Sequence, residues 1–203
     1  MVTVHDHGSR YLIVGLGNPG REYEQTRHNV GSMLADRLAA LYDFRFQNCG
    51  HSYLGRAVVS GFDVAVAKPR TYMNLSGRAV VEAQRTLAVP VENIIAAYDD
   101  CDLPLGRIRI KEDGGSGGHK GIASIVNALE DSGFLRIRLG IGRPVSEREG
   151  LKDYVLEPFN DDEADAVDAM LKNGVAAIET IIKDGAATAM NRFNGVKNVN
   201  REP

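Results

Sequence analysis

Short apolar runs alternate with amphipathic helical patterns along most of this 203-residue chain, and this alternation constrains the fold more than any other feature. The predicted strands are residues 11–14, 53–59, 62–67, 93–98, 107–111 and 134–142. The predicted helices are residues 29–42, 76–88, 119–129 and 161–183. Because Ser60-Gly61 reads as a hairpin turn, we expect a single α/β domain over residues 1–203. Its twisted sheet would be mixed but mostly parallel, with helices on both faces and frayed ends at residues 1–9 and 195–203.

Cysteine usage and the absence of long apolar runs narrow the class of protein. No run approaches the ~20 apolar residues that span a membrane, and residues 1–8 lack the basic and apolar regions of a signal peptide. Cys49 and Cys101 are isolated in the sequence, which favours reduced thiols over a disulfide or a metal site. We therefore expect a cytoplasmic protein without a membrane partner.

Charge is unevenly distributed along the chain. The net charge of −3 argues against a protein that coats nucleic acid, but eight basic residues outnumber five acidic ones between Arg107 and Arg148. A local basic surface and ordinary solvated charges are both compatible with this pattern. Acidic residues crowd the start of the last predicted helix, where Asn160 and Glu163 can cap it, and Gly185 is expected to end it.

Gly15, Gly17 and Gly20 follow the first predicted strand with the G-x-G-x-x-G spacing of a dinucleotide-binding turn. In that turn the third glycine lies at the start of a helix whose N-terminus holds the pyrophosphate. Here residues 21–28 show no apolar stripe, and the next helical pattern begins only near Asn29. The late start of this helix therefore disfavours a nucleotide-binding enzyme. Tight, saturable binding of NAD would support that alternative.

Polar residues follow four of the predicted strands, at residues 18–28, 68–74, 99–102 and 114–121. Because ligand sites in α/β sheets lie beyond the carboxyl ends of the strands, we expect these loops to converge on one cleft. His28 is the histidine that lies among polar loop residues near this cleft, and Asp99 follows directly after an apolar strand. A carboxylate that fixes the tautomer of an imidazole lets it take a proton from water.

These residues predict a hydrolase in which His28 and Asp99 activate water, and in which the Asn18 and Asn74 amides donate to a substrate carbonyl or its oxyanion. A loop-packing histidine, a turn-capping aspartate and asparagines bonded to their own backbone fit the same positions. No serine lies in a G-x-S-x-G elbow, and we find no set of side chains at metal-ligand spacing. We therefore expect neither a metal nor a cofactor.

Several sequence blocks together resemble bacterial peptidyl-tRNA hydrolase over about residues 11–193. Each block is moderately specific, and their order and separation make the resemblance highly specific. The blocks are residues 13–20 (IVGLGNPG), 22–23 with 26–29 (EY, TRHN), 71–77 (TYMNLSG), 99 with 102–104 and 106, 117–119 with 121 (GGH, G), and 136–142 (RIRLGIG).

The resemblance implies a metal-free esterase that cuts the ester between a peptide and the 3′ ribose of tRNA and so recycles tRNA from aborted translation. His28 would be the base, Asp99 its orienting partner, and Asn18 a contact near the ester. Asn74 would bind the peptide backbone or the tRNA end, with Tyr23 and Tyr72 lining the site. The resemblance also implies that Arg109, Lys111 and Arg138 clamp the tRNA 5′-phosphate and acceptor stem, that the late helix lies beside the cleft as a lid, and that the enzyme is a monomer.

Lys120 departs from the pattern of the family, whose best-known members carry asparagine after Gly-Gly-His. A lysine donates hydrogen bonds but accepts none, so we expect Lys120 to face the substrate without inheriting the role of asparagine. The rival interpretation is a non-catalytic relative that uses the same fold to bind RNA. Such an adaptor would have no need for His28, Asp99, Asn18 and Asn74 together.

Overall fold

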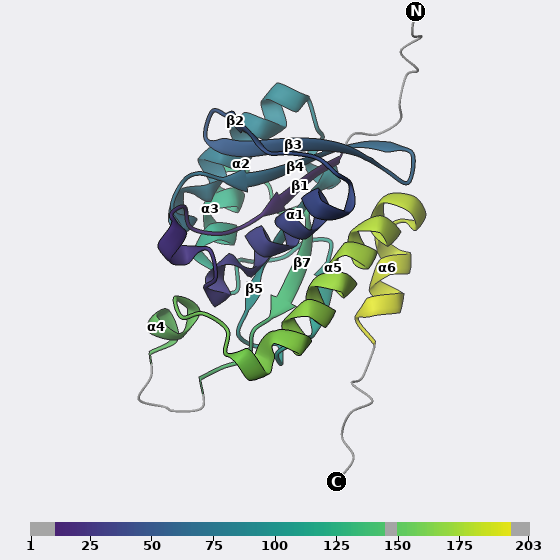
Figure 1. The fold of residues 1–203 in the computed structure, drawn as a ribbon. Helices are drawn as coiled ribbons and strands as arrows, with labels where there is room; N and C mark the ends of the chain where they lie inside the picture. Colours follow the sequence, from purple (N-terminus) through teal and green to yellow (C-terminus); the bar gives the residue numbers. More distant parts are fainter. Residues whose placement is uncertain (1–10, 145–149, 196–203) are drawn as a thin grey trace, which may run out of the picture.

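The computed structural model describes residues 11–144 and 150–195, which form a single α/β domain. Its centre is a seven-stranded mixed sheet with helices on both faces (Figure 1). The ends that we expected to be frayed lie outside the described residues, except for Gly195. The predicted fold class is confirmed.

The sheet has the strand order β2-β3-β4-β1-β5-β7-β6. The strands are β1 (Tyr11–Gly15), β2 (Gln47–Cys49), β3 (Ser52–Val59), β4 (Phe62–Pro69), β5 (Ile94–Asp100), β6 (Ile108–Lys111) and β7 (Leu135–Gly140). The central strands β4, β1, β5 and β7 are parallel to one another, whereas β3 pairs antiparallel with β2 and β4, and β6 pairs antiparallel with β7. The carboxyl ends of the four parallel strands therefore meet at one edge of the sheet, which is where a ligand site is expected.

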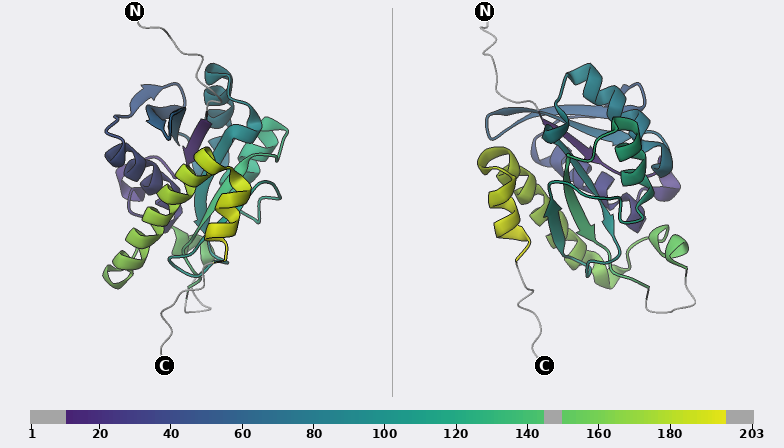
Figure 2. Two further views of the ribbon diagram at one scale, coloured as in Figure 1. Left: turned by 90° about the vertical axis from the view of Figure 1, so that its right-hand side faces the viewer. Right: turned by 180° about the vertical axis from the view of Figure 1, so that it is seen from behind.

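Helices cover the two faces of this sheet in two separate apolar cores (Figure 2). α1 (Val30–Leu41), α5 (Ala164–Asp184) and α6 (Ala186–Phe193) share a core with Ile13 of β1. α2 (Ser76–Leu87) and α3 (Lys120–Leu129) share the other core with Leu12 and Val14. Neighbouring residues of β1 thus point to opposite cores, as the period of two in a strand requires. No helix in the described ranges is long and apolar enough to cross a membrane.

The termini of the long helix follow the predicted signals. The Glu163 side chain accepts a hydrogen bond from the Asn160 N–H at 2.7 Å in a capping box, and a short 3₁₀ turn, η5 (Asp161–Glu163), leads into α5. Gly185 ends α5 with φ of 87°, a value that disfavours residues with a side chain. The strand β2, the helices α4 (Leu151–Val155) and α6, and the short 3₁₀ turns were not predicted.

Close backbone contacts explain Gly15 at the end of β1 and Gly31 in the first turn of α1. A Cβ at Gly15 would lie 2.4 Å from the carbonyl oxygen of Gly31, and one at Gly31 would lie 2.2 Å from that of Ala97 in β5. The chain then forms two 3₁₀ turns, η1 (Arg21–Tyr23) and η2 (Arg27–Asn29), and α1 begins only at Val30. The late helix start confirms the sequence argument against a dinucleotide-binding turn.

The outer edge of β6 is covered by the segment that follows α6. The Asn194 side chain accepts a hydrogen bond from the Ile110 N–H at 2.7 Å and donates one to the Ile110 carbonyl at 3.0 Å. Ile108 and Ile110 point into the core with α5 and α6, so Arg109 and Lys111 face the opposite side and are exposed.

Candidate active site

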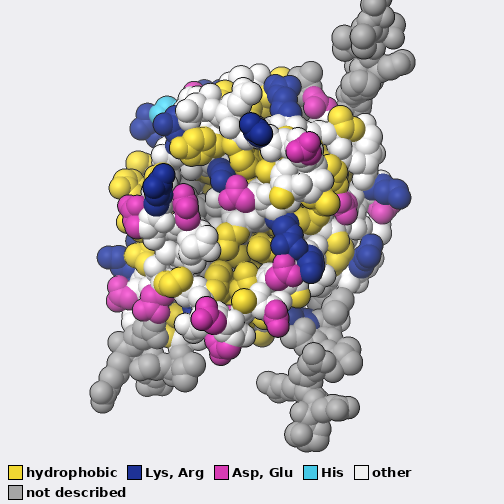
Figure 3. Space-filling view, viewed as in Figure 1, with side chains coloured by type: hydrophobic (Ala, Val, Ile, Leu, Met, Phe, Trp, Pro, Cys, Tyr) yellow, Lys and Arg dark blue, Asp and Glu magenta, His cyan; other side chains and the backbone are white. Residues whose placement is uncertain are grey.

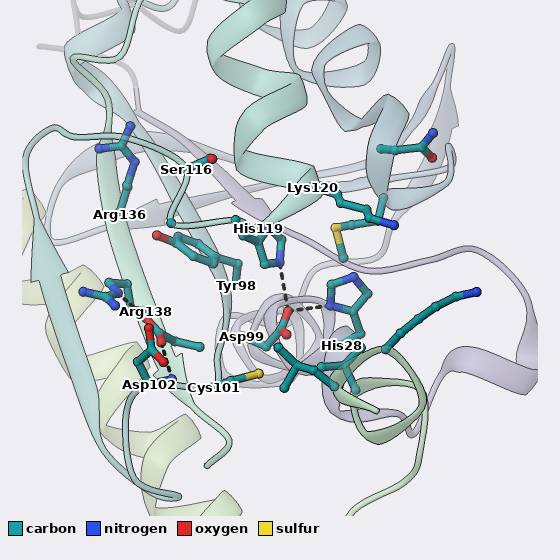
Figure 4. Close-up of a pocket in the computed structure, with 18 of the residues that line it drawn as sticks. His28, Tyr98, Asp99, Cys101, Asp102, Ser116, His119, Lys120, Arg136 and Arg138 are labelled. Atoms are coloured by element: carbon teal, nitrogen blue, oxygen red, sulfur yellow. Dashed lines mark hydrogen bonds and ion pairs between the residues drawn. The ribbon is translucent and has the colours of Figure 1, made fainter. Parts of the chain in front are cut away.

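A cleft of about 1010 Å³ begins beyond the carboxyl ends of β1, β4 and β5 and extends along β7 as far as Lys111 and Arg136 (Figure 4). Residues of α4 form one of its walls. Ten of its lining residues are labelled in the close-up. The lining residues on which the chemistry depends, not all of them labelled there, are Asn18, His28, Tyr72, Asn74, Tyr98, Asp99, Lys111, His119, Lys120, Arg136 and Arg138. The structure thus brings together nearly all of the residues that sequence analysis proposed.

Asp99 lies at the centre of the cleft and binds two histidines through the same oxygen (Figure 4). Its Oδ1 is 2.8 Å from Nδ1 of His28 and 3.0 Å from Nε2 of His119. Asp99 comes from the end of β5, His28 from η2, and His119 from the residue that caps α3. The side chain of Asp99 is only 3% exposed, and the two imidazoles form hydrogen bonds with its carboxylate in the described cleft.

The hydrogen bonds assign the protons of both imidazoles. Nδ1 of His119 accepts a hydrogen bond from the Ile122 N–H at 3.2 Å, so its Nε2 carries the proton and donates it to Asp99. His28 donates to Asp99 from Nδ1, which leaves the lone pair on its Nε2. A neutral His28 therefore presents an unprotonated nitrogen, the form that a general base requires.

Burial of Asp99 would raise its pKa, but the hydrogen bonds from His119 and His28 outweigh this effect and lower the pKa to about 2. The carboxylate is consequently ionised at neutral pH. A fixed negative charge beside His28 stabilises the positive charge that develops on that imidazole when it accepts a proton.

Asn18 is held so that its amide nitrogen is left to donate. Its Oδ1 accepts a hydrogen bond from the Met73 N–H at 2.9 Å. The buried Asn29 side chain accepts from the Asn18 N–H at 2.8 Å and donates to the Asn18 carbonyl at 2.9 Å, which fixes the loop. Gly17 makes room for this contact, because a Cβ there would lie 2.9 Å from Cγ of Asn29. Since Oδ1 is occupied, Nδ2 of Asn18 is the group available to the cleft that it lines.

The other residues expected near the substrate divide into two groups. Tyr72, Asn74 and Lys120 line the cleft and are exposed. Tyr23 is not among the lining residues, which differs from our expectation. Its carbonyl instead accepts hydrogen bonds from both the N–H and the hydroxyl of Thr26, and so shapes the loop that leads to His28.

The basic residues of the expected clamp are also divided. Lys111 and Arg138 line the cleft, whereas Arg109 does not. Nε of Arg138 is paired with the carboxylate of Asp100. Arg136, which sequence analysis did not propose, is 1% exposed, and its Nε and Nη1 have no hydrogen-bond partner among the described residues. On the face shown in Figure 3, basic and acidic side chains are interspersed, without a continuous basic stripe.

His119 and the strand before it correct two details of the sequence analysis. His28 was expected to be the histidine of the cleft, but His119 contacts the same carboxylate. Residues 114–121 were expected to begin at the same edge of the sheet as the other loops of the cleft. However, β6 is antiparallel to β7 and ends beside Arg136, at the opposite edge. The segment starts there, where the Gly114 carbonyl accepts from Arg136 at 2.7 Å, and runs back to Asp99. The glycine-rich stretch directly before a helix was the available signal for His119.

His28, Asp99 and His119 are also the group in the described residues that could hold a metal ion, since their ligand atoms lie within 4.8 Å of one another. Coordination through Nε2 of His119 would move its proton to Nδ1, which faces the Ile122 N–H. Metal binding would thus break the hydrogen bond that caps α3. The observed pattern fits a carboxylate hydrogen-bonded by two imidazoles better than a metal centre.

Comparisons with known proteins agree with this geometry. The chain matches the Peptidyl-tRNA hydrolase family profile over residues 12–202. It is 43% identical over 188 residues to the peptidyl-tRNA hydrolase of Clostridium acetobutylicum, covering 92% of this chain and 99% of that protein. It is 45% identical over 185 residues to that of Koribacter versatilis, covering 90% and 92%. The crystal structure of peptidyl-tRNA hydrolase from Acinetobacter baumannii superposes with a TM-score of 0.86 at 37% identity, covering 92% and 95%. The chain therefore belongs to the peptidyl-tRNA hydrolase family of enzymes.

Proposed function

We propose that this enzyme hydrolyses the ester between a peptide and the 3′-terminal ribose of tRNA with a water molecule activated by His28 and Asp99. The observation that carries the proposal is the hydrogen bond between Nδ1 of His28 and Asp99, which leaves Nε2 of His28 as a base inside the cleft. Family membership supplies the substrate, and the geometry supplies a chemical route. The expected role is recycling of tRNA from aborted translation.

The reaction follows from the proton positions. Nε2 of His28 accepts a proton from water as the water oxygen attacks the ester carbonyl, and Asp99 stabilises the imidazolium that forms. The tetrahedral intermediate carries a negative charge on the former carbonyl oxygen, and Nδ2 of Asn18 donates to it. When the intermediate collapses, the C–O bond to the ribose breaks and His28 returns the proton to the ribose oxygen. No electrons are exchanged, so a redox cofactor has no part in the reaction.

His119 completes this arrangement from the other side of Asp99. Its Nε2–H holds the carboxylate at 3.0 Å, so His119 keeps Asp99 ionised and oriented toward His28. Asn74 and Tyr72 extend the lining away from the histidines and would contact the peptide backbone or the tRNA end. Lys120 is exposed and lies in the same lining, where its ammonium group would donate to a phosphate or carbonyl of the substrate.

We expect the tRNA to lie along the basic side of the cleft. Lys111 and Arg138 are in the lining, and Arg109 shares the exposed face of β6 with Lys111. Such contacts to phosphate make binding weaken as salt concentration rises. We expect the enzyme to act as a monomer in the cytoplasm without an obligate protein partner.

The deciding experiment measures peptide release from an N-acylated aminoacyl-tRNA by the purified wild-type protein and by the His28→Ala variant. We expect release by the wild type and a loss of about 10³-fold or more in the variant, because the general base is gone. His51→Ala is the matched control, since His51 is exposed and pairs with Glu82 outside the cleft. A wild-type protein that binds tRNA without releasing peptide would support the rival RNA-binding adaptor.

A further inference from the structure

Three consecutive residues of η2 hold three separate parts of the active site. His28 contacts Asp99, and Asn29 fixes the loop of Asn18 through two hydrogen bonds. The Arg27 side chain instead contacts residues of the segment 154–163, which begins in α4 and ends in η5. This 3₁₀ turn therefore lies between the catalytic pair and one wall of the cleft.

Arg27 is buried and is held by contacts of several kinds. Its side chain is 4% exposed, and its Nη2 donates to Glu163 at 2.8 Å. Nη1 donates to the Pro158 carbonyl. The guanidinium lies over two aromatic rings, 4.5 Å from the centroid of Tyr154 and 5.1 Å from that of Phe159. The fork of donors and the flat cation that these contacts use are properties of arginine that lysine lacks.

The backbone adds to this attachment. The Arg27 N–H donates to the Glu157 carbonyl at 2.9 Å, and Thr26 forms an isolated bridge with Pro158. Glu163, which balances the charge of Arg27, also accepts from the Asn160 N–H and so begins the long helix. One buried cation thus joins the turn that carries His28 to the start of α5.

The segment held by Arg27 supplies a wall of the cleft. Leu151, Lys152, Val155 and Leu156 of α4 and its C-terminal end line the same cavity as His28 and Asp99. A second attachment of this wall is the hydrogen bond that the Tyr154 hydroxyl donates to the Ile141 carbonyl at 2.6 Å. The Arg27 side chain, together with these backbone contacts, therefore joins the wall to the catalytic turn.

We infer that Arg27 is a positioning residue that holds the α4 wall against the catalytic turn and thereby determines how tightly the enzyme binds its substrate. This inference rests on the proposed function, in that the wall contacts the peptidyl-tRNA. Arg27 does not touch the reacting atoms, and the contacts of His28 and His119 with Asp99 are independent of its side chain. Its loss should consequently weaken binding and leave proton transfer intact.

The test compares Arg27→Gln and Glu163→Gln with a matched control, Arg37→Gln. Arg37 also joins the N-terminal half of the chain to α5, through a 2.7 Å ion pair with Asp168, but this pair is half-exposed and remote from the cleft lining. We measure kcat and KM for peptide release, and the pH dependence of kcat. In the absence of substrate, mass spectrometry follows the rate at which trypsin cleaves after Lys152, a lining residue of the wall.

For Arg27→Gln we expect KM to rise about fivefold or more, kcat to stay within about threefold, and the pH dependence of kcat to be unchanged. Cleavage after Lys152 should accelerate about fivefold or more, since a detached wall opens more often. Glu163→Gln should change both quantities in the same direction but less, and it decides the matter if Arg27→Gln does not fold. Arg37→Gln should match the wild type in KM and in cleavage.

Two results would overturn the inference. One is an unchanged KM together with an unchanged cleavage rate in both variants. The other is a fall in kcat with an altered pH dependence at constant KM, which would mean that Arg27 acts through His28. The proteolysis arm needs no substrate, so a wild-type protein that releases no peptide would refute the proposed function while the attachment of the wall is still tested.

Discussion

Replacing Asp99 by asparagine separates the charge of the proposed catalytic pair, His28 and Asp99, from its geometry. In the native protein Oδ1 of Asp99 accepts hydrogen bonds from His28 at 2.8 Å and from His119 at 3.0 Å. The asparagine side chain has the same shape, and its one oxygen can accept both hydrogen bonds. The variant Asp99→Asn thus removes the negative charge while it can retain the tautomers of both imidazoles.

The expected loss of activity follows from the charge separation. An imidazolium and a carboxylate about 4 Å apart attract each other by about 4 kcal/mol at an effective dielectric constant of about 20. Without this attraction the barrier rises by up to that amount, which corresponds to a fall in kcat of roughly 10³-fold. KM should change little, because the attraction develops only as His28 accepts its proton.

The same substitution has a separate effect on stability. The pKa of Asp99 falls from its ordinary value of 3.8 to about 2 in the folded protein, because hydrogen bonds from His119 and His28 outweigh the opposing effect of burial. The unfolded chain therefore binds more protons between about pH 4 and pH 2, so the folded protein gains stability as pH rises through this window. The gain is about 2 kcal/mol and is complete above about pH 5. Asp99→Asn should lose this amount at pH 7 and little at pH 2.

The assay combines peptide release at pH 7 with urea unfolding at pH 7 and near pH 2. A kcat for Asp99→Asn within about tenfold of the wild type would refute the electrostatic role assigned to Asp99. A free energy of unfolding equal to that of the wild type at pH 7 would refute the argument from the pKa. Asp168→Asn is a suitable control, because Asp168 is paired with Arg37 and Lys172 at the surface, away from the cleft lining.

Three further outcomes are expected. Gly31→Ala should destabilise the fold by about 1–3 kcal/mol in urea unfolding, since the added Cβ would meet the Ala97 carbonyl oxygen at 2.2 Å; wild-type stability would contradict the close packing. Prolonged treatment with EDTA should leave peptide release unchanged, and a loss that added metal restores would overturn the metal-free mechanism. Arg138→Glu should raise KM for tRNA substrates more than for short substrates without the acceptor stem, because a negative charge replaces a positive one that would contact phosphate. The variant also leaves Asp100 beside a second carboxylate. Equal effects on both substrates would refute the clamp.

The fold was largely predictable from the sequence because its long elements follow simple periodicities. The late start of α1 and the capping box before α5 were both visible in residue types. Two of the elements that were missed, β2 and α4, carry little periodic signal. β2 is three residues long and fully exposed, and α4 has only five residues, so neither shows an alternation that sequence can reveal. Their positions depend on tertiary packing.

The centre of the site was predictable in part. The sequence analysis paired His28 with Asp99 because each follows a strand whose carboxyl end lies at the same edge, and they are indeed hydrogen-bonded. His119 was harder to place, since the strand before it is antiparallel and its loop returns from the opposite edge. Strand direction at the end of a sheet depends on long-range pairing, which local sequence does not encode.

The charged residues show the same limit. Sequence analysis grouped Arg109, Lys111 and Arg138 as basic residues, but only contacts in the folded protein distinguish them. Arg138 has a carboxylate partner in Asp100, and Arg109 lies outside the lining of the cleft. Arg136 is almost fully buried with two nitrogens unpartnered among the described residues, a combination that composition cannot reveal.

The side chain of Asn194 has a consequence for how copies of this protein meet one another. The free N–H and C=O groups of a strand at the edge of a sheet can pair with another polypeptide chain, and this pairing is a common route to aggregation. On β6 both of these groups of Ile110 are already bound by the single amide of Asn194. One side chain thus occupies part of the place of an eighth strand, and it leaves fewer free backbone groups on this edge with which a second molecule could pair.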